Sequence, residues 1–137
     1  MANTKRRIIY TDATKSKENQ FKVGLYDPEI NLTYTLLLKE NVNNVNEAEK
    51  YGILYALYYI NRNQLENAHI LNDSLSSVND KKLKKLATYL SIQISWIPRE
   101  INLVADKIAR LEPTQKEEVW YDLSLLNNLI HEKHLEK

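Results

Sequence analysis

The alternation of apolar and polar residues predicts three strands in the first third of the chain. Residues 7–12, RIIYTD, are rich in β-branched and aromatic types, and residues 21–27, FKVGLYD, alternate at the period of a half-buried strand. The segment 27–31, DPEIN, predicts a turn, and residues 32–40, LTYTLLLKE, follow as a third strand. Short polar links between these segments favour an antiparallel meander.

The hydrophobic period changes at about residue 46. In NEAEKYGILYALYYINR, apolar residues recur every three or four positions, which predicts a helix with a wide apolar face. Asn46 is expected to cap this helix, and Glu47 and Glu49 to occupy its first turn. Gly52 lowers the intrinsic stability of a helix, so we expect it to mark a close approach to the sheet.

Two further strands are predicted in the second half of the chain. Residues 67–72, NAHILN, form a short strand that runs into Asp73, and residues 91–98, SIQISWIP, form another, with Trp96 in the core. Between them a single helix is expected from about Asn79, with four apolar residues on one face: Leu83, Leu86, Ala87 and Leu90.

Two helices are predicted after the last strand, over residues 100–112 and about 115–135. The element order is then β-β-β-α-β-α-β-α plus a C-terminal helix. It predicts an α/β fold, with a five-stranded mixed sheet of three antiparallel strands and then parallel strands, and helices on both faces. The segment EPTQKEE, residues 112–118, suggests a main domain over 1–113 and a helical extension over 114–137. The extension either packs on the domain or serves for association, for example as a dimer surface.

Composition narrows the function classes. The 137 residues, 43% hydrophobic and 27% charged, suit one folded domain. There is no cysteine, which excludes disulfides and thiolate chemistry and fits a cytoplasmic location. Two glycines are too few for a glycine-rich phosphate loop, and a net charge of +1 means that nucleic acid would have to bind at local patches. No apolar run approaches a membrane span, and no signal peptide is evident, so we expect no membrane partner.

Four acids occupy special places in the predicted elements. Asp12 is expected at the end of the first strand and Asp73 just after the fourth, so both reach one rim of the sheet if these strands are neighbours. The helices carrying Glu49 and Asp106 could bring these two acids to the same rim. Clustered acids repel one another, and divalent cations such as Mg²⁺ or Mn²⁺ remove that repulsion. Taken singly, each acid is more typical of a helix cap, a turn or a solvated surface than of a metal ligand.

Four segments carry a resemblance to a known family. YTDAT, NEAEKYGILYAL, ILNDS and WIPREINLVADKIA, spread over residues 7–111, resemble the four motifs of compact type 1 ribonuclease H. The resemblance implies a ribonuclease H fold and endonucleolytic cleavage of the RNA strand of RNA–DNA hybrids. It also implies two Mg²⁺ ions, replaceable by Mn²⁺, held by Asp12, Glu49, Asp73 and Asp106, with Asp12 bridging both.

Candidate substrate contacts lie near these motifs, where polar groups could recognise the RNA 2′-hydroxyl. Beside the acids these are Ala13, Thr14, Asn44, Asn46, Ser74, Arg99 and Asn102. A lysine patch could bind phosphate, although a merely solvated face is the alternative: Lys81, Lys82, Lys84 and Lys85.

The chain also departs from the family pattern. The histidine that larger members carry before the last acid is missing, and so is their basic insertion. Two alternatives therefore stay open: a nuclease of this fold that acts on another nucleic acid, such as structured DNA, and a non-catalytic nucleic-acid-binding module.

Overall fold

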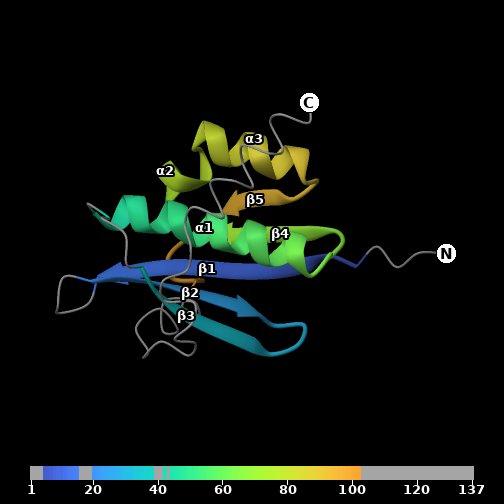
Figure 1. The fold of residues 1–137 in the computed structure, drawn as a ribbon, viewed down its shortest axis with the longest axis horizontal. Coiled ribbons are helices and arrows are strands. Elements are labelled where there is room, and N and C mark those ends of the chain that lie inside the picture. The colour runs from blue at the N-terminus through green and yellow to red at the C-terminus, as the bar shows by residue number, and fades with distance from the viewer. Residues whose placement is uncertain (1–4, 16–19, 39–41, 43, 103–137) are drawn as a thin grey trace.

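The computed structural model describes residues 5–15, 20–38, 42 and 44–102. Within these residues, five strands form one sheet in the order β3-β2-β1-β4-β5, and three helices accompany it (Figure 1). The elements in chain order are β1 Arg7–Lys15, β2 Phe21–Asp27, β3 Leu32–Leu38, α1 Val45–Arg62, β4 Ala68–Asn72, α2 Leu75–Val78, α3 Lys81–Tyr89 and β5 Gln93–Trp96.

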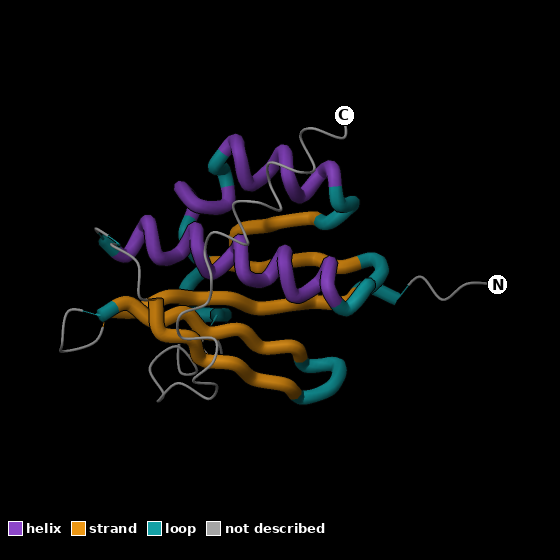
Figure 2. Tube along the Cα trace, in the orientation of Figure 1, coloured by secondary structure: helices purple, strands orange, loops and turns teal. Residues whose placement is uncertain are grey.

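The pairing of the strands confirms the predicted mixed sheet (Figure 2). β1 is antiparallel to β2 and β2 to β3, whereas β4 runs parallel to both β1 and β5. The first and fourth strands are therefore neighbours, which is the arrangement that brings Asp12 and Asp73 to one rim.

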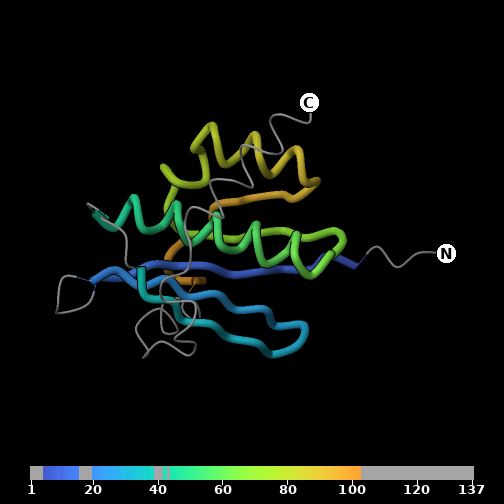
Figure 3. Tube along the Cα trace, in the orientation of Figure 1, coloured from blue at the N-terminus to red at the C-terminus, as the bar shows by residue number. Residues whose placement is uncertain are grey.

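The hydrophobic core lies between α1 and the central strands. Ile9 of β1, Val23 of β2 and Ile70 of β4 are at most 1% exposed, and so are Ile53 and Leu57 of α1. In Figure 3 the green α1 runs alongside the blue β1, and α2 and α3 lie beside α1 on the β5 side of the sheet. None of the helices within the described ranges is long and apolar enough to span a bilayer.

β1 is longer than predicted, and this changes the position of Asp12. Antiparallel pairing with β2 continues to Lys15 opposite Phe21, whereas parallel pairing with β4 stops at Tyr10 opposite Leu71. Asp12 therefore lies inside β1, paired with Gly24, and not at the end of the strand. It is placed where β1 continues past the end of β4, because the hairpin with β2 keeps β1 extended there.

The start of α1 also differs from the prediction. The helix is capped by Asn44 rather than Asn46: the extended Asn44 accepts a hydrogen bond from the amide of Glu47 through Oδ1, at 2.9 Å. Both asparagines suit a cap, and only the backbone geometry distinguishes them. Glu49 consequently lies in the second turn, where its side chain is 3% exposed.

The connection between β4 and β5 contains two helices instead of one. Ser74 caps the short α2, and Asp80 caps α3 by accepting from the amide of Leu83 at 3.0 Å. Of the four residues predicted for the apolar face of this helix, Leu83, Leu86 and Ala87 are buried. The fourth, Leu90, caps the end of α3 and is half-buried. The helix predicted from about Asn79 is α3, which begins at Lys81, whereas the short helix α2 before it was not predicted.

One of the predicted core residues is at the surface, and several predictions fall on other parts of the chain. Trp96 was expected in the core but is 46% exposed, because it lies at the end of the edge strand β5. Residues 100 and 101, at the start of the helix predicted over 100–112, form a turn, and Ile101, expected to face inward, is exposed. The rest of that helix, the helix predicted over 115–135 and the boundary at residue 113 lie outside the described residues.

A buried ion pair joins the start of β1 to the end of β2, at the end of the sheet away from Asp12. Arg7 donates to both carboxylate oxygens of Asp27, at 3.0 and 2.8 Å, and the hydroxyl of Tyr59 donates to Asp27 Oδ2 at 2.7 Å. Asp27 is fully buried, so these donors replace the water that it loses. The hydrogen bond to Asp27 is the main cause that raises the pKa of Arg7, and burial is the main cause that raises the pKa of Tyr59.

Gly52 lies where α1 packs against the sheet, as predicted, but its neighbours leave room for a methyl group. A methyl group at this position would meet Val23 Cγ1 at 3.5 Å and the carbonyl oxygen of Asp12 at 3.8 Å, which are ordinary contact distances.

We therefore expect Gly52→Ala to stabilise the fold by about 0.5–1 kcal/mol, because alanine loses less backbone freedom in a helix and fills available space. Urea unfolding of the two proteins measures this difference. A loss of stability would mean that the helix requires a closer approach than these distances indicate.

Candidate metal centre

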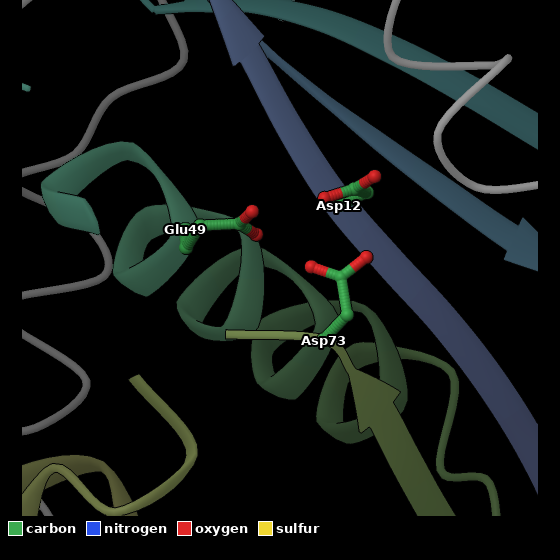
Figure 4. A group of neighbouring side chains, drawn as sticks. All are labelled: Asp12, Glu49 and Asp73. Atoms are coloured by element: carbon green, nitrogen blue, oxygen red, sulfur yellow. The ribbon is translucent and has the colours of Figure 1, made fainter. Parts of the chain in front are cut away.

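Three of the four predicted acids meet at one point of the fold. Asp12 comes from β1, Glu49 from the second turn of α1, and Asp73 directly follows β4. Figure 4 shows the three carboxylates directed toward one another. One oxygen from each lies within 4.8 Å of the others, a spacing at which a single cation can be shared. Asp106 lies outside the described residues.

The burial of these acids makes their charge costly. Asp12 is 4% and Glu49 3% exposed, and Asp73 is half-buried. Burial is the largest cause that raises the pKa of the Glu49 carboxyl far above its ordinary value of 4.5. A hydrogen bond to Asp12 and the charges of Asp12 and Asp73 raise this pKa further, whereas the amide of Asn72 opposes the rise. All the causes that raise it are burial or neighbouring acids.

The donor set fits a hard divalent cation. Three carboxylates offer only oxygen ligands, which Mg²⁺ and Mn²⁺ prefer. Asp73 Oδ1 is a buried oxygen that has no hydrogen-bond partner among the described residues, so it keeps an unused lone pair. Buried oxygens are normally satisfied, and one that is left over beside two other acids is what a metal ligand requires.

Neutral amides surround the acids. Asn72, the last residue of β4, donates to Glu49 Oε1 at 3.0 Å and to the hydroxyl of Thr11 at 2.8 Å. Asn102 donates to Asp73 Oδ2 at 3.2 Å and to the carbonyl oxygen of Thr11 at 2.9 Å. Both asparagines are at most 1% exposed. Asn102, predicted as a substrate contact, therefore lies inside the site and contacts one of its acids, Asp73.

A cleft brings together four of the predicted substrate contacts. It lies between the first half of α1 and the start of α3, and its volume is about 830 Å³. Lys50 contributes a further positive charge and pairs with Asp80 at 3.3 Å. The predicted residues on its walls are Asn44, Asn46, Lys81 and Lys82.

The other predicted contacts lie elsewhere. Lys84 lines a separate hollow against β5, and Lys85 is exposed on α3. Ala13 is 6% exposed, and its amide donates to Asp12 Oδ1 at 2.9 Å. Thr14 and Ser74 are half-buried near the acids in sequence, and Arg99 is exposed in the turn after β5.

Three residues at the site were missed by sequence reasoning. Asn72 immediately precedes Asp73, Lys50 follows Glu49, and the exposed Trp96 donates through Nε1 to the carbonyl oxygen of Asp73 at 3.2 Å. A polar residue in a buried strand position was an available signal for Asn72, because buried amides need partners. No comparable signal distinguished Trp96 from a core tryptophan.

Two solved structures share this architecture at low sequence identity. Ribonuclease H1 from the halophilic archaeon Halobacterium salinarum NRC-1 matches with a TM-score of 0.53 and 18% identity, over 86% of this chain and 99% of that chain. The N-terminal RNase H domain of Rv2228c from Mycobacterium tuberculosis matches with a TM-score of 0.51 and 19% identity, over 76% and 95%. The fold is ribonuclease H-like. No protein-family model and no curated protein sequence matches the chain.

We expect Glu49→Gln to stabilise the metal-free protein at alkaline pH. The folded state keeps a proton on Glu49 that the unfolded state releases above its ordinary pKa of 4.5, so stability falls as pH rises from there toward the raised pKa. The glutamine removes this dependence. The variant should gain on the order of 2 kcal/mol over the parent at pH 8 and little at pH 4.

Urea unfolding in EDTA at several pH values measures this gain, with Glu66→Gln, at an exposed acid after α1, as the control. Added Mn²⁺ should stabilise the parent more than the Glu49→Gln protein. Equal pH profiles for the two proteins would mean that the pKa of Glu49 is not raised in the folded protein.

Proposed function

We propose that this protein is a metal-dependent ribonuclease H that hydrolyses the RNA strand of RNA–DNA hybrids. The observation that carries the proposal is the meeting of Asp12, Glu49 and Asp73, with one oxygen each within 4.8 Å, at the rim of a ribonuclease H-like sheet. The match of the chain's four segments to the family motifs supports the substrate class, and Asp106 is the fourth acid of that set.

In this proposal Asp12, Glu49, Asp73 and Asp106 hold two Mg²⁺ ions, which Mn²⁺ can replace. When bound, such a pair activates a water for attack on the phosphorus and stabilises the leaving 3′ oxygen. The protein's own part is to present oxygen ligands at fixed positions. It needs no side-chain nucleophile, which is consistent with the absence of cysteine.

Recognition of RNA requires contacts to the 2′-hydroxyl, which distinguishes it from DNA. Asn44 and Asn46 are exposed at the start of α1, three to five residues before Glu49, and are suited to donate to and accept from a sugar hydroxyl. Ser74 follows Asp73 directly and offers a second hydroxyl contact on the other side of the acids.

The second strand of the duplex is proposed to bind at the cleft between α1 and α3. Lys81 and Lys82 line it beside Lys50, which is paired with Asp80, and lysines neutralise phosphates without regard to sequence. A net charge of +1 means that this local group, rather than the whole surface, has to attract the duplex.

We expect the protein to nick the RNA strand of a labelled hybrid in Mg²⁺ or Mn²⁺ and to be inactive in EDTA. Asp12→Asn should lower the rate at least about 100-fold, because it removes a charged ligand while keeping the side-chain volume. Gel assays of hybrid, RNA duplex and DNA duplex in parallel provide the measurement.

Each outcome of this assay has a distinct meaning. Metal-dependent cleavage of structured DNA with the hybrid intact would replace the proposed substrate. Hybrid binding with no cleavage in either metal would favour a non-catalytic binding module. Glu66→Gln is the charge-matched control and should cleave as the parent does.

We expect Lys81→Ala/Lys82→Ala to raise the KM for hybrid with kcat nearly unchanged, because these residues hold the duplex and not the reacting phosphate. The slope of log affinity against log salt should fall by about 2. Lys84→Ala/Lys85→Ala, on the same helix but outside the cleft, is the matched control. Equal effects of both pairs would indicate a diffuse charge effect and not a cleft.

A further inference from the structure

We propose that Asn72 and Asn102 are positioning residues that fix the two acids flanking Asp12 by tying each of them to Thr11. This inference rests on the proposed function, because it assigns the two asparagines a role in holding metal ligands. We call the pair of side chains, together with Thr11, the asparagine clamp.

The first half of the clamp orients Glu49. Asn72 Nδ2 donates to Glu49 Oε1 at 3.0 Å, to Thr11 Oγ1 at 2.8 Å and to the Thr11 carbonyl oxygen at 3.2 Å. Its Oδ1 accepts from the amide of Ser74 at 2.7 Å. Asn72 is fully buried, so these contacts leave its side chain a single orientation.

The second half orients Asp73. Asn102 Nδ2 donates to Asp73 Oδ2 at 3.2 Å and to the Thr11 carbonyl oxygen at 2.9 Å. Both asparagines therefore converge on the carbonyl oxygen of the residue that precedes Asp12. Three acids from separate elements are thus held relative to one peptide group of β1.

The clamp also determines which carboxylate oxygens are available. On Asp73 the amide of Asn102 takes Oδ2, and Oδ1 stays buried without a hydrogen-bond partner among the described residues. On Glu49 the amide of Asn72 takes Oε1 in the same way. Asp73 therefore keeps one oxygen for a cation, whereas Glu49 is held both by Asn72 and by its hydrogen bond to Asp12.

Neutral amides suit this task better than charged side chains. A lysine or arginine in the same place would neutralise the acids and compete with the cation. An amide orients the carboxylate and leaves its charge in place, which is the usual contribution of groups that support metal ligands.

The test is Mn²⁺ binding by the full chain, measured by isothermal titration, with stability measured by urea unfolding. Asn72→Leu, which keeps the volume and removes the amide, and Asn102→Leu should each weaken Mn²⁺ binding about 10–100-fold. Asn72→Thr is a second variant that suits a strand and cannot span both Thr11 and Glu49; it should weaken binding while the protein remains folded.

Tyr59→Phe separates metal binding from stability, because it removes a buried hydrogen bond at the opposite end of the sheet. It should lower stability and leave Mn²⁺ affinity unchanged. Variants that are folded and bind Mn²⁺ as the parent does would overturn the clamp and leave the metal site standing. A parent that takes up no Mn²⁺ at millimolar concentration would overturn both the clamp and the proposed function.

Discussion

The mutual repulsion of three carboxylates, held with one oxygen each within 4.8 Å, is the constraint on which the rest of this site depends. Burial removes the water that would otherwise stabilise their charges. This loss of water is the main cause of the raised pKa of Glu49. Amides from Asn72 and Asn102 orient the acids without neutralising them. The acids therefore repel one another, and the two amides do not balance their charge. A divalent cation bound by their oxygens would remove this repulsion.

The same sheet contains a buried acid in the opposite situation. Asp27, at the other end, receives two hydrogen bonds from Arg7 and one from Tyr59, so its charge is balanced within the protein. At Asp27 the protein itself supplies the positive charge that balances the buried acid. Around Glu49, every cause that raises the pKa is burial or another acid. The difference between the two ends supports a role for the acidic end in binding an external cation.

The sheet order makes the acidic end possible. Because β1 lies between an antiparallel and a parallel neighbour, it continues to Lys15 along β2 after its pairing with β4 has stopped at Tyr10. Asp73 lies just past the end of β4, and Glu49 reaches the same place from α1. The cap at Asn44 sets where α1 begins, and Glu49 points inward because it lies on the buried face of the helix, with Gly52 and Ile53.

The sequence alone predicted the five strands, their mixed pairing and the three acids that meet. Hydrophobic period and motif spacing can be read from residues that are near one another in the chain. The sequence did not determine the cap at Asn44, the break between α2 and α3, the exposure of Trp96 or the asparagine clamp. Several nearby residues satisfy the same local rule for a cap, and a strand pattern does not show whether its end lies at a sheet edge. The partners of a buried amide come from segments as far apart as Thr11 and Asn102, so only the packed structure could select them.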